Sequence, residues 1–187
     1  MSKFLDLIKK QRKEKKDDKF EGTFLEYLSL LEENPDIAKH AHKRLYDAIC
    51  KSGVNPMDDE NPRKKKIFND DNIKVYDYFK SEFYGNERVI EKLMQFLKGA
   101  AMRGEESRQV LLLMGPVGAG KSALTEHIKS SLDGEVYYYL DKDPQKGEPL
   151  QLLPRSLRGR FEEMLGVKIE GDLSPIARWR LLEEYKG

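Results

Sequence analysis

The sequence holds little that would tie it to a secreted, membrane or nucleic-acid-binding protein. Its 187 residues include one cysteine, Cys50, which excludes an internal disulfide and is typical of a reducing compartment. No apolar run approaches the length of a membrane-spanning helix, and the N-terminus lacks the apolar core of a signal peptide. Because 34 lysines and arginines face 33 aspartates and glutamates, the net charge of +1 gives no general attraction to nucleic acid or membrane. We expect a soluble cytoplasmic protein with neither as a partner.

A glycine-rich motif stands out against this background. Residues 115–122, Gly-Pro-Val-Gly-Ala-Gly-Lys-Ser, match the Walker A pattern of phosphate-binding loops (P-loops), Gly-x-x-x-x-Gly-Lys-[Ser/Thr], at every position. The apolar run 110–114 precedes the motif, and a helical pattern over 123–128 follows it. A strand, a glycine-rich loop and a helix form the context in which this motif binds nucleotide. The sequence therefore predicts a nucleotide site here.

Each residue type in the loop has a physical role. Glycines let successive N–H groups turn toward phosphate oxygens, and the following helix adds the positive end of its dipole. Lys121 is predicted to reach the β- and γ-phosphates as the catalytic residue, and Ser122 to ligate Mg²⁺. The predicted nucleotide-binding residues of the loop are Gly115, Pro116, Val117, Gly118, Ala119, Gly120, Lys121, Ser122 and Ala123.

The chain divides by composition into four parts. Residues 1–19 are dominated by charge, which predicts a solvated tail or helix. Residues 20–53 carry apolar residues at helical spacing on both sides of Asn34, which predicts a helical hairpin. Residues 54–72 have the composition of a linker. Residues 73–187 contain the loop and are predicted to form the nucleotide domain.

Two candidate strands decide the predicted fold class. The run 110–114 is apolar at every position, which predicts a strand buried on both faces in a parallel sheet. Residues 136–140 are aromatic and apolar and form the second candidate. A two-stranded parallel sheet is not expected to stand alone. The predicted class is an α/β P-loop NTPase with an incomplete parallel sheet, preceded by an N-terminal helical region, and truncated relative to a larger protein.

Helices are predicted around this sheet. A stripe from Val89 to Ala101 has helical spacing, and Asn86 can cap it. A helix ending at Gly166 and another capped by Ser174 are predicted near the C-terminal end.

The residues after the loop contain no conclusive second motif. An NTPase also needs an acid for Mg²⁺, usually at a strand end, and a group that orients the nucleophile. Asp141 follows the second candidate strand, but Lys142 stands after it instead of another acid. Asp141 is still the best candidate for such an acid, and a small P-loop phosphotransferase that uses it is one alternative. The glycine-rich loop, His-Arg-Asp and Asp-Phe-Gly motifs of protein kinases do not occur in this sequence.

Other stretches carry a family resemblance. They include Glu82-Phe83-Tyr84-Gly85 before the loop, residues 112–122 around it, and residues 169–175, Ile-Glu-Gly-Asp-Leu-Ser-Pro, after it. Together they resemble the N-terminal portion of the PrkA family of serine protein kinases with an AAA+ ATPase module. Residues 141–145, Asp-Lys-Asp-Pro-Gln, depart from the family, in which many members carry a Cys-Pro-Met-like segment.

The resemblance implies an AAA+ fold with strand order 5-1-4-3-2, ATP and Mg²⁺ as cofactors, and a possible homo-oligomer. It implies that the Walker B acids, the sensor and the lid lie beyond Gly187. It places Tyr84 and Gly85 where AAA+ proteins contact adenine, although Phe83 and Tyr84 could instead be core aromatics. Two functions stay open: the ATP-binding part of an ATPase or serine protein kinase of unknown protein substrate, and a nucleotide-responsive docking module without catalysis.

Overall fold

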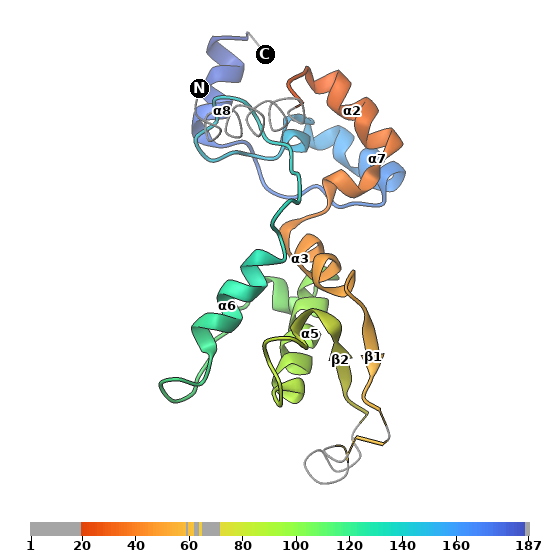
Figure 1. Cartoon of the computed structure of the whole chain (residues 1–187). Coiled ribbons are helices and arrows are strands. Elements are labelled where there is room, and N and C mark those ends of the chain that lie inside the picture. The colour runs from red at the N-terminus through yellow and green to blue at the C-terminus, as the bar shows by residue number, and fades with distance from the viewer. Residues whose placement is uncertain (1–19, 59, 62–63, 65–71, 186–187) are drawn as a thin grey trace, which may run out of the picture. The chain divides into compact units, whose positions relative to one another are not determined.

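The computed structural model describes residues 20–58, 60–61, 64 and 72–185, so the predicted charged tail over 1–19 lies outside the described residues. The chain forms two compact units (Figure 1). One comprises Ala38–Tyr137 and contains the phosphate loop. The other combines Met1–Ile37 with Tyr138–Gly187. In the described ranges, no helix has both the length and the apolar character that a membrane span requires.

The unit that contains the loop is built from helices around a short antiparallel strand pair. Strands β1 (Val54–Pro56) and β2 (Lys74–Tyr76) pair with Asn55 opposite Val75. Its other elements are α3 (Ala41–Cys50), η2 (Asp77–Phe79), α5 (Glu87–Ala101), η3 (Glu105–Arg108) and α6 (Lys121–Ser130).

Helix α5 forms the centre of this unit because its apolar stripe is buried almost as predicted. Ile90, Leu93, Met94 and Leu97 are buried, whereas Val89 is 53% exposed and points away from the core. Asn86 occupies the N-cap position but makes no side-chain cap bond. The stripe packs against buried side chains from α3, β2, η2, α6 and the turn before α5, namely Ile49, Tyr76, Phe79, Leu124 and Phe83.

The two predicted parallel strands do not form within the described residues. Residues 110–114 and 136–140 are irregular, and the sheet that does form is antiparallel and comes from segments that were not predicted as strands. A strand needs a neighbour for its backbone N–H and C=O groups. In the described ranges no strand lies beside Val110–Met114. Its side chains are exposed, Val110 by 92% and Met114 by 83%, except for Leu113, which packs against the core.

The second unit consists of short helices whose ends follow the sequence signals. They are α2 (Phe24–Glu33), η1 (Pro35–Ala38, whose last residue already belongs to the other unit), η4 (Pro149–Leu152), α7 (Arg155–Leu165) and α8 (Pro175–Glu183). Thr23 and Glu26 form a capping box at the start of α2. Gly166 ends α7 in the left-handed conformation at φ 65°, and the Ser174 hydroxyl caps α8, both as predicted.

The helix predicted after Asn34 is shorter than expected. The Asn34 side chain accepts a hydrogen bond from the Asp36 N–H at 3.2 Å, as a cap should, but η1 ends after one turn. The chain resumes helical structure only at Ala41, where α3 begins. Because α2 and α3 belong to different units, the hairpin over 20–53 stays a prediction.

Candidate functional site

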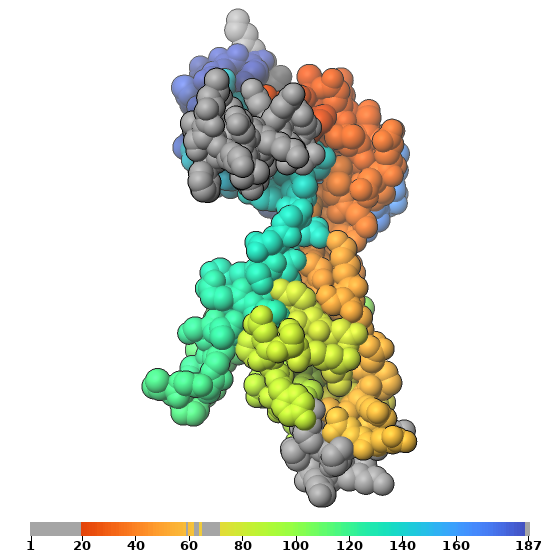
Figure 2. Space-filling view, viewed as in Figure 1, coloured from red at the N-terminus to blue at the C-terminus, as the bar shows by residue number. Residues whose placement is uncertain are grey.

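The phosphate loop protrudes from the surface of its unit as the green segment that leads into α6 (Figure 2). Gly118 and Gly120 have φ angles of 81° and 77°, in the left-handed region that other residues rarely adopt. The Ala119 N–H donates to the Pro116 carbonyl oxygen at 3.3 Å and closes a turn. Gly120 is the N-cap of α6. Backbone conformation therefore explains two of the motif's three glycines.

Lys121 begins α6 and folds back over the loop. Its Nζ donates to the carbonyl oxygens of Gly115 at 2.8 Å and Pro116 at 2.6 Å. Ser122 and Ala123 follow in the first turn and are exposed. The first N–H groups of a helix have no acceptor within the helix, and the helix dipole is positive at this end. The start of α6 therefore suits an anion.

The turn at Tyr84 and Gly85 lies beside the loop. Gly85 has a φ of 88°, and its N–H donates to Glu87 Oε1 at 3.3 Å. Tyr84 is 80% exposed, whereas Phe83 is buried, so only Phe83 is a core aromatic. Phe83 Cε1 lies 4.0 Å from the position that a Cβ on Gly120 would take. Phe83 therefore links the turn to the end of the loop.

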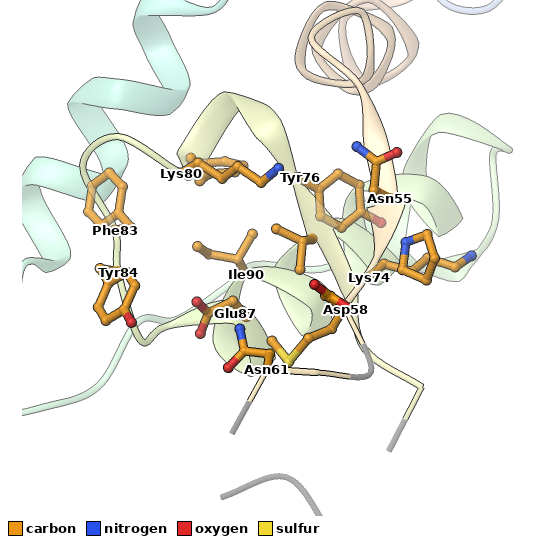
Figure 3. Close-up of a pocket in the computed structure, with 14 residues that line it drawn as sticks. Asn55, Asp58, Asn61, Lys74, Tyr76, Lys80, Phe83, Tyr84, Glu87 and Ile90 are labelled. Atoms are coloured by element: carbon orange, nitrogen blue, oxygen red, sulfur yellow. The ribbon is translucent and has the colours of Figure 1, made fainter. Parts of the chain in front are cut away.

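A pocket of about 380 Å³ opens between this turn and the strand pair. Figure 3 shows Phe83 and Tyr84 at one end of it and Asn55 and Lys74 at the other. Its volume falls within the usual range for small-molecule sites. No residue of the phosphate loop lines this pocket. Sequence reasoning missed it because its wall includes residues 55–58 and Asn61, from a segment whose composition predicts only a linker.

The pocket wall mixes charged, amide and apolar groups. Glu87 is buried although it carries a carboxylate, and it lies next to Ile90 on the same helix. The polar lining residues are Asn55, Asp58, Asn61, Lys74, Lys80 and Glu87. Such a lining can accept hydrogen bonds from amino groups and donate them to ring nitrogens or hydroxyls.

The Mg²⁺ ligand predicted at Ser122 stays a prediction, because a single serine hydroxyl is not a cluster of metal-binding side chains. Among the described residues, no group of three or more histidine, cysteine, aspartate or glutamate side chains could hold a metal ion. Ser122 is exposed at the start of α6. Asp141 is exposed in a turn, in the unit that does not contain the loop.

Sequence reasoning singled out Asp141, but its neighbour Asp143 organises this segment. Asp143 is buried and accepts hydrogen bonds from the Gln145 N–H at 3.2 Å, the Gly147 N–H at 2.9 Å and the Ser174 hydroxyl at 2.7 Å. The Ser174 hydroxyl bond, supported by the two amide bonds, lowers the pKa of Asp143. These contacts give Asp143 a structural role. The sequence does not reveal it, because its partner Ser174 lies 31 positions further along the chain.

Comparison with known proteins gives a family match. The family model described as the PrkA AAA domain matches residues 22–187. The chain is 38% identical over 190 residues to the ATP-dependent protease PrkA of Bacillus subtilis (strain 168), covering 98% of this chain and 28% of that protein. It is 37% identical over 133 residues to the serine/threonine kinase YeaG of Escherichia coli (strain K12), covering 70% of this chain and 20% of that protein.

A more distant relative matches a shorter part. The chain is 32% identical over 63 residues to a mitochondrial Lon protease homolog of Yarrowia lipolytica, which covers 34% of this chain and 5% of that protein. No solved structure matches the chain. The chain thus spans less than a third of the length of each of these three relatives.

Proposed function

Because this chain belongs to the PrkA AAA-domain family, we propose that residues 115–123 bind the triphosphate of Mg·ATP and that Tyr84 and Gly85 contact its base. The observation that carries the proposal is the loop itself. Gly118 and Gly120 adopt left-handed angles directly before the N-terminus of α6, and Lys121 lies over the same loop. An AAA domain is a nucleotide-binding fold, which agrees with this arrangement.

Both the backbone and the side chains of the loop would contact the nucleotide and its Mg²⁺. The N–H groups of Gly120, Lys121 and Ser122 would donate to β-phosphate oxygens, and the α6 dipole would favour their negative charge. The Lys121 ammonium would stabilise charge on the γ-phosphate as the leaving bond breaks, which makes it the catalytic residue. The Ser122 hydroxyl would hold Mg²⁺, which supplies positive charge between the phosphates when it is bound.

The base would lie against the exposed Tyr84 ring. An aromatic face that is 80% exposed offers a stacking surface, and stacking on one base contributes roughly 1–3 kcal/mol. Gly85 has no side chain to block the approach. The Phe83 ring lies 4.0 Å from the position that a Cβ on Gly120 would take, so the turn is close enough to the loop for one nucleotide to reach both.

For the whole protein we propose ATP hydrolysis that drives a conformational cycle, in the cytoplasm and in a homo-oligomer. The two more similar of the three named relatives differ in description, since one is called an ATP-dependent protease and the other a serine/threonine kinase. ATP is the reactant that both descriptions require.

Replacing Lys121 tests the proposal. Lys121→Ala should weaken Mg·ATP binding by roughly 10- to 100-fold, because it deletes a charge-assisted hydrogen bond to phosphate. Lys129→Ala is the matched control, since it removes an exposed lysine from the same helix. The measurement is isothermal titration calorimetry with Mg·ATP. Equal affinity for the original chain and Lys121→Ala would rule the proposal out.

Phosphate release separates the two candidate functions. Turnover of ATP that Lys121→Ala abolishes would favour an ATPase, whereas ATP binding without turnover in the full-length protein would favour a docking module. The mixed polar and apolar pocket beside Tyr84 would then be a second place to look for a bound partner group.

A further inference from the structure

We infer that His127 is a positioning residue that clamps the segment Tyr78–Gly85 to α6 and so fixes the base contact relative to the phosphate loop. The clamp rests on contacts within the unit that contains the loop, whereas its effect on nucleotide binding rests on the proposed function. His127 lies in the second turn of α6, on the helix that begins at Lys121. The segment that it touches leads directly into Tyr84.

The first part of the clamp is a reciprocal pair of hydrogen bonds. Nε2 of His127 lies 3.0 Å from the Tyr78 carbonyl oxygen. The Tyr78 hydroxyl in turn donates to the His127 carbonyl oxygen at 2.6 Å. A carbonyl oxygen can only accept, so Nε2 carries the proton in this contact. Each residue therefore holds the backbone of the other across elements distant in sequence.

The second part of the clamp is a ring cluster. The His127 imidazole has its centroid 4.4 Å from that of Tyr78, 5.6 Å from that of Phe79 and 5.4 Å from that of Phe83. Only 14% of its side chain is exposed. Nδ1 lies 3.3 Å from Glu82 Oε2. A single side chain thus contacts four residues of the segment.

Through these contacts His127 connects the helix that follows the loop with the segment that leads to Tyr84. Toward the segment, Phe83 is followed at once by Tyr84 and Gly85. Toward the loop, α6 is a short helix whose N-cap, Gly120, lies close to the Phe83 ring. A core residue that only fills space would need no hydrogen-bond donor here. The reciprocal backbone bonds indicate instead that the register between segment and helix is held.

Hydrogen exchange on the ligand-free full chain tests the clamp directly. His127→Phe keeps a ring but deletes the donor to Tyr78. We expect the amides of Glu82 and Phe83, both bonded to the Phe79 carbonyl oxygen, to exchange roughly tenfold faster, as the loss of one hydrogen bond predicts. His127→Gln, whose amide can donate to Tyr78, should restore part of the protection. Glu126→Gln, exposed on the same helix, is the control.

Calorimetry with two ligands tests the consequence. Mg·ATP uses base and phosphate contacts, whereas inorganic tripolyphosphate uses the loop alone. In His127→Phe, we expect ATP affinity to fall by roughly 3- to 10-fold while tripolyphosphate affinity stays within about twofold. Unchanged ATP affinity, or equal losses for both ligands, would overturn the positioning role.

The two proposals fail separately. If the original chain binds neither ligand, the phosphate-loop proposal is wrong, and the exchange experiment still decides on the clamp. If protection at Glu82 and Phe83 is the same in His127→Phe and in the original chain, the clamp is wrong whatever the affinities are.

Discussion

Two apolar segments of the same unit differ in how far their side chains are buried. The stripe of α5 is buried, with Met94 at 0% exposure, whereas four of the five residues of the run 110–114 are exposed, with Met114 at 83%, and Leu113 alone of the five packs against the core. A helix satisfies its own backbone groups and needs only a surface to pack against. A strand needs a neighbour of matching register before its side chains can be buried. Apolar content therefore predicts burial only where the backbone hydrogen bonds can also be made.

The largest expected effect comes from truncating one methionine in each segment. Met94→Ala should lower the free energy of unfolding by roughly 2–5 kcal/mol, because it opens a cavity in the core cluster that Met94 shares with Phe79 and Leu97. Met114→Ala should change it by no more than about 0.5 kcal/mol, since that side chain is exposed. Urea unfolding measures both. Equal losses of unfolding free energy would mean that Met114 is packed in solution, and the difference in burial between the two segments would not hold.

Glycine substitutions should give the next largest effect. Gly120→Ala places a side chain at a φ of 77° and should cost about 1–3 kcal/mol while weakening Mg·ATP binding. Gly159→Ala, within α7 and with open space around it, should instead stabilise by about 0.5–1 kcal/mol. Thermal unfolding of both variants provides the test. A lower melting temperature for Gly159→Ala would contradict the expectation that helix propensity alone decides the effect at this position.

The smallest expected effect is a pH dependence in the second unit. The pKa of Asp143 is lowered in the folded chain, so its contribution to stability is present above its ordinary value of 3.8 and is lost as the pH falls through the lower, folded value. We expect the melting temperature to fall on acidification, and to fall less in Asp143→Asn. Parallel curves for the two proteins between pH 6 and 3 would contradict this.

Local signals were the part of the fold that the sequence could predict. The α5 stripe, the Gly166 stop and the Ser174 cap depend on residues close together in the chain, and each was found. The pairing of β1 with β2 was not predicted. Each strand has only three residues, which is too short for an alternating pattern, and residues 57–73 separate the two in sequence.

The candidate site divides in the same way. The phosphate loop is one contiguous motif, so its residues could be named in advance, and their binding roles stay predictions. His127 was missed because its hydrogen-bonding partner Tyr78 is 49 positions away. The pocket was missed because its wall joins β1 and β2 to the turn before α5. Contacts between distant segments are a property of the folded chain, which periodicity and spacing do not encode.

The two carbonyl bonds of Lys121 have a consequence for how a nucleotide arrives. The ammonium already donates to the oxygens of Gly115 and Pro116, so under the proposed function an incoming phosphate would compete with two internal acceptors. Binding would then be partly an exchange reaction, and its enthalpy would include the difference between the bonds lost and the charge-assisted bonds gained. The same two bonds would hold Lys121 against the loop when no nucleotide is bound.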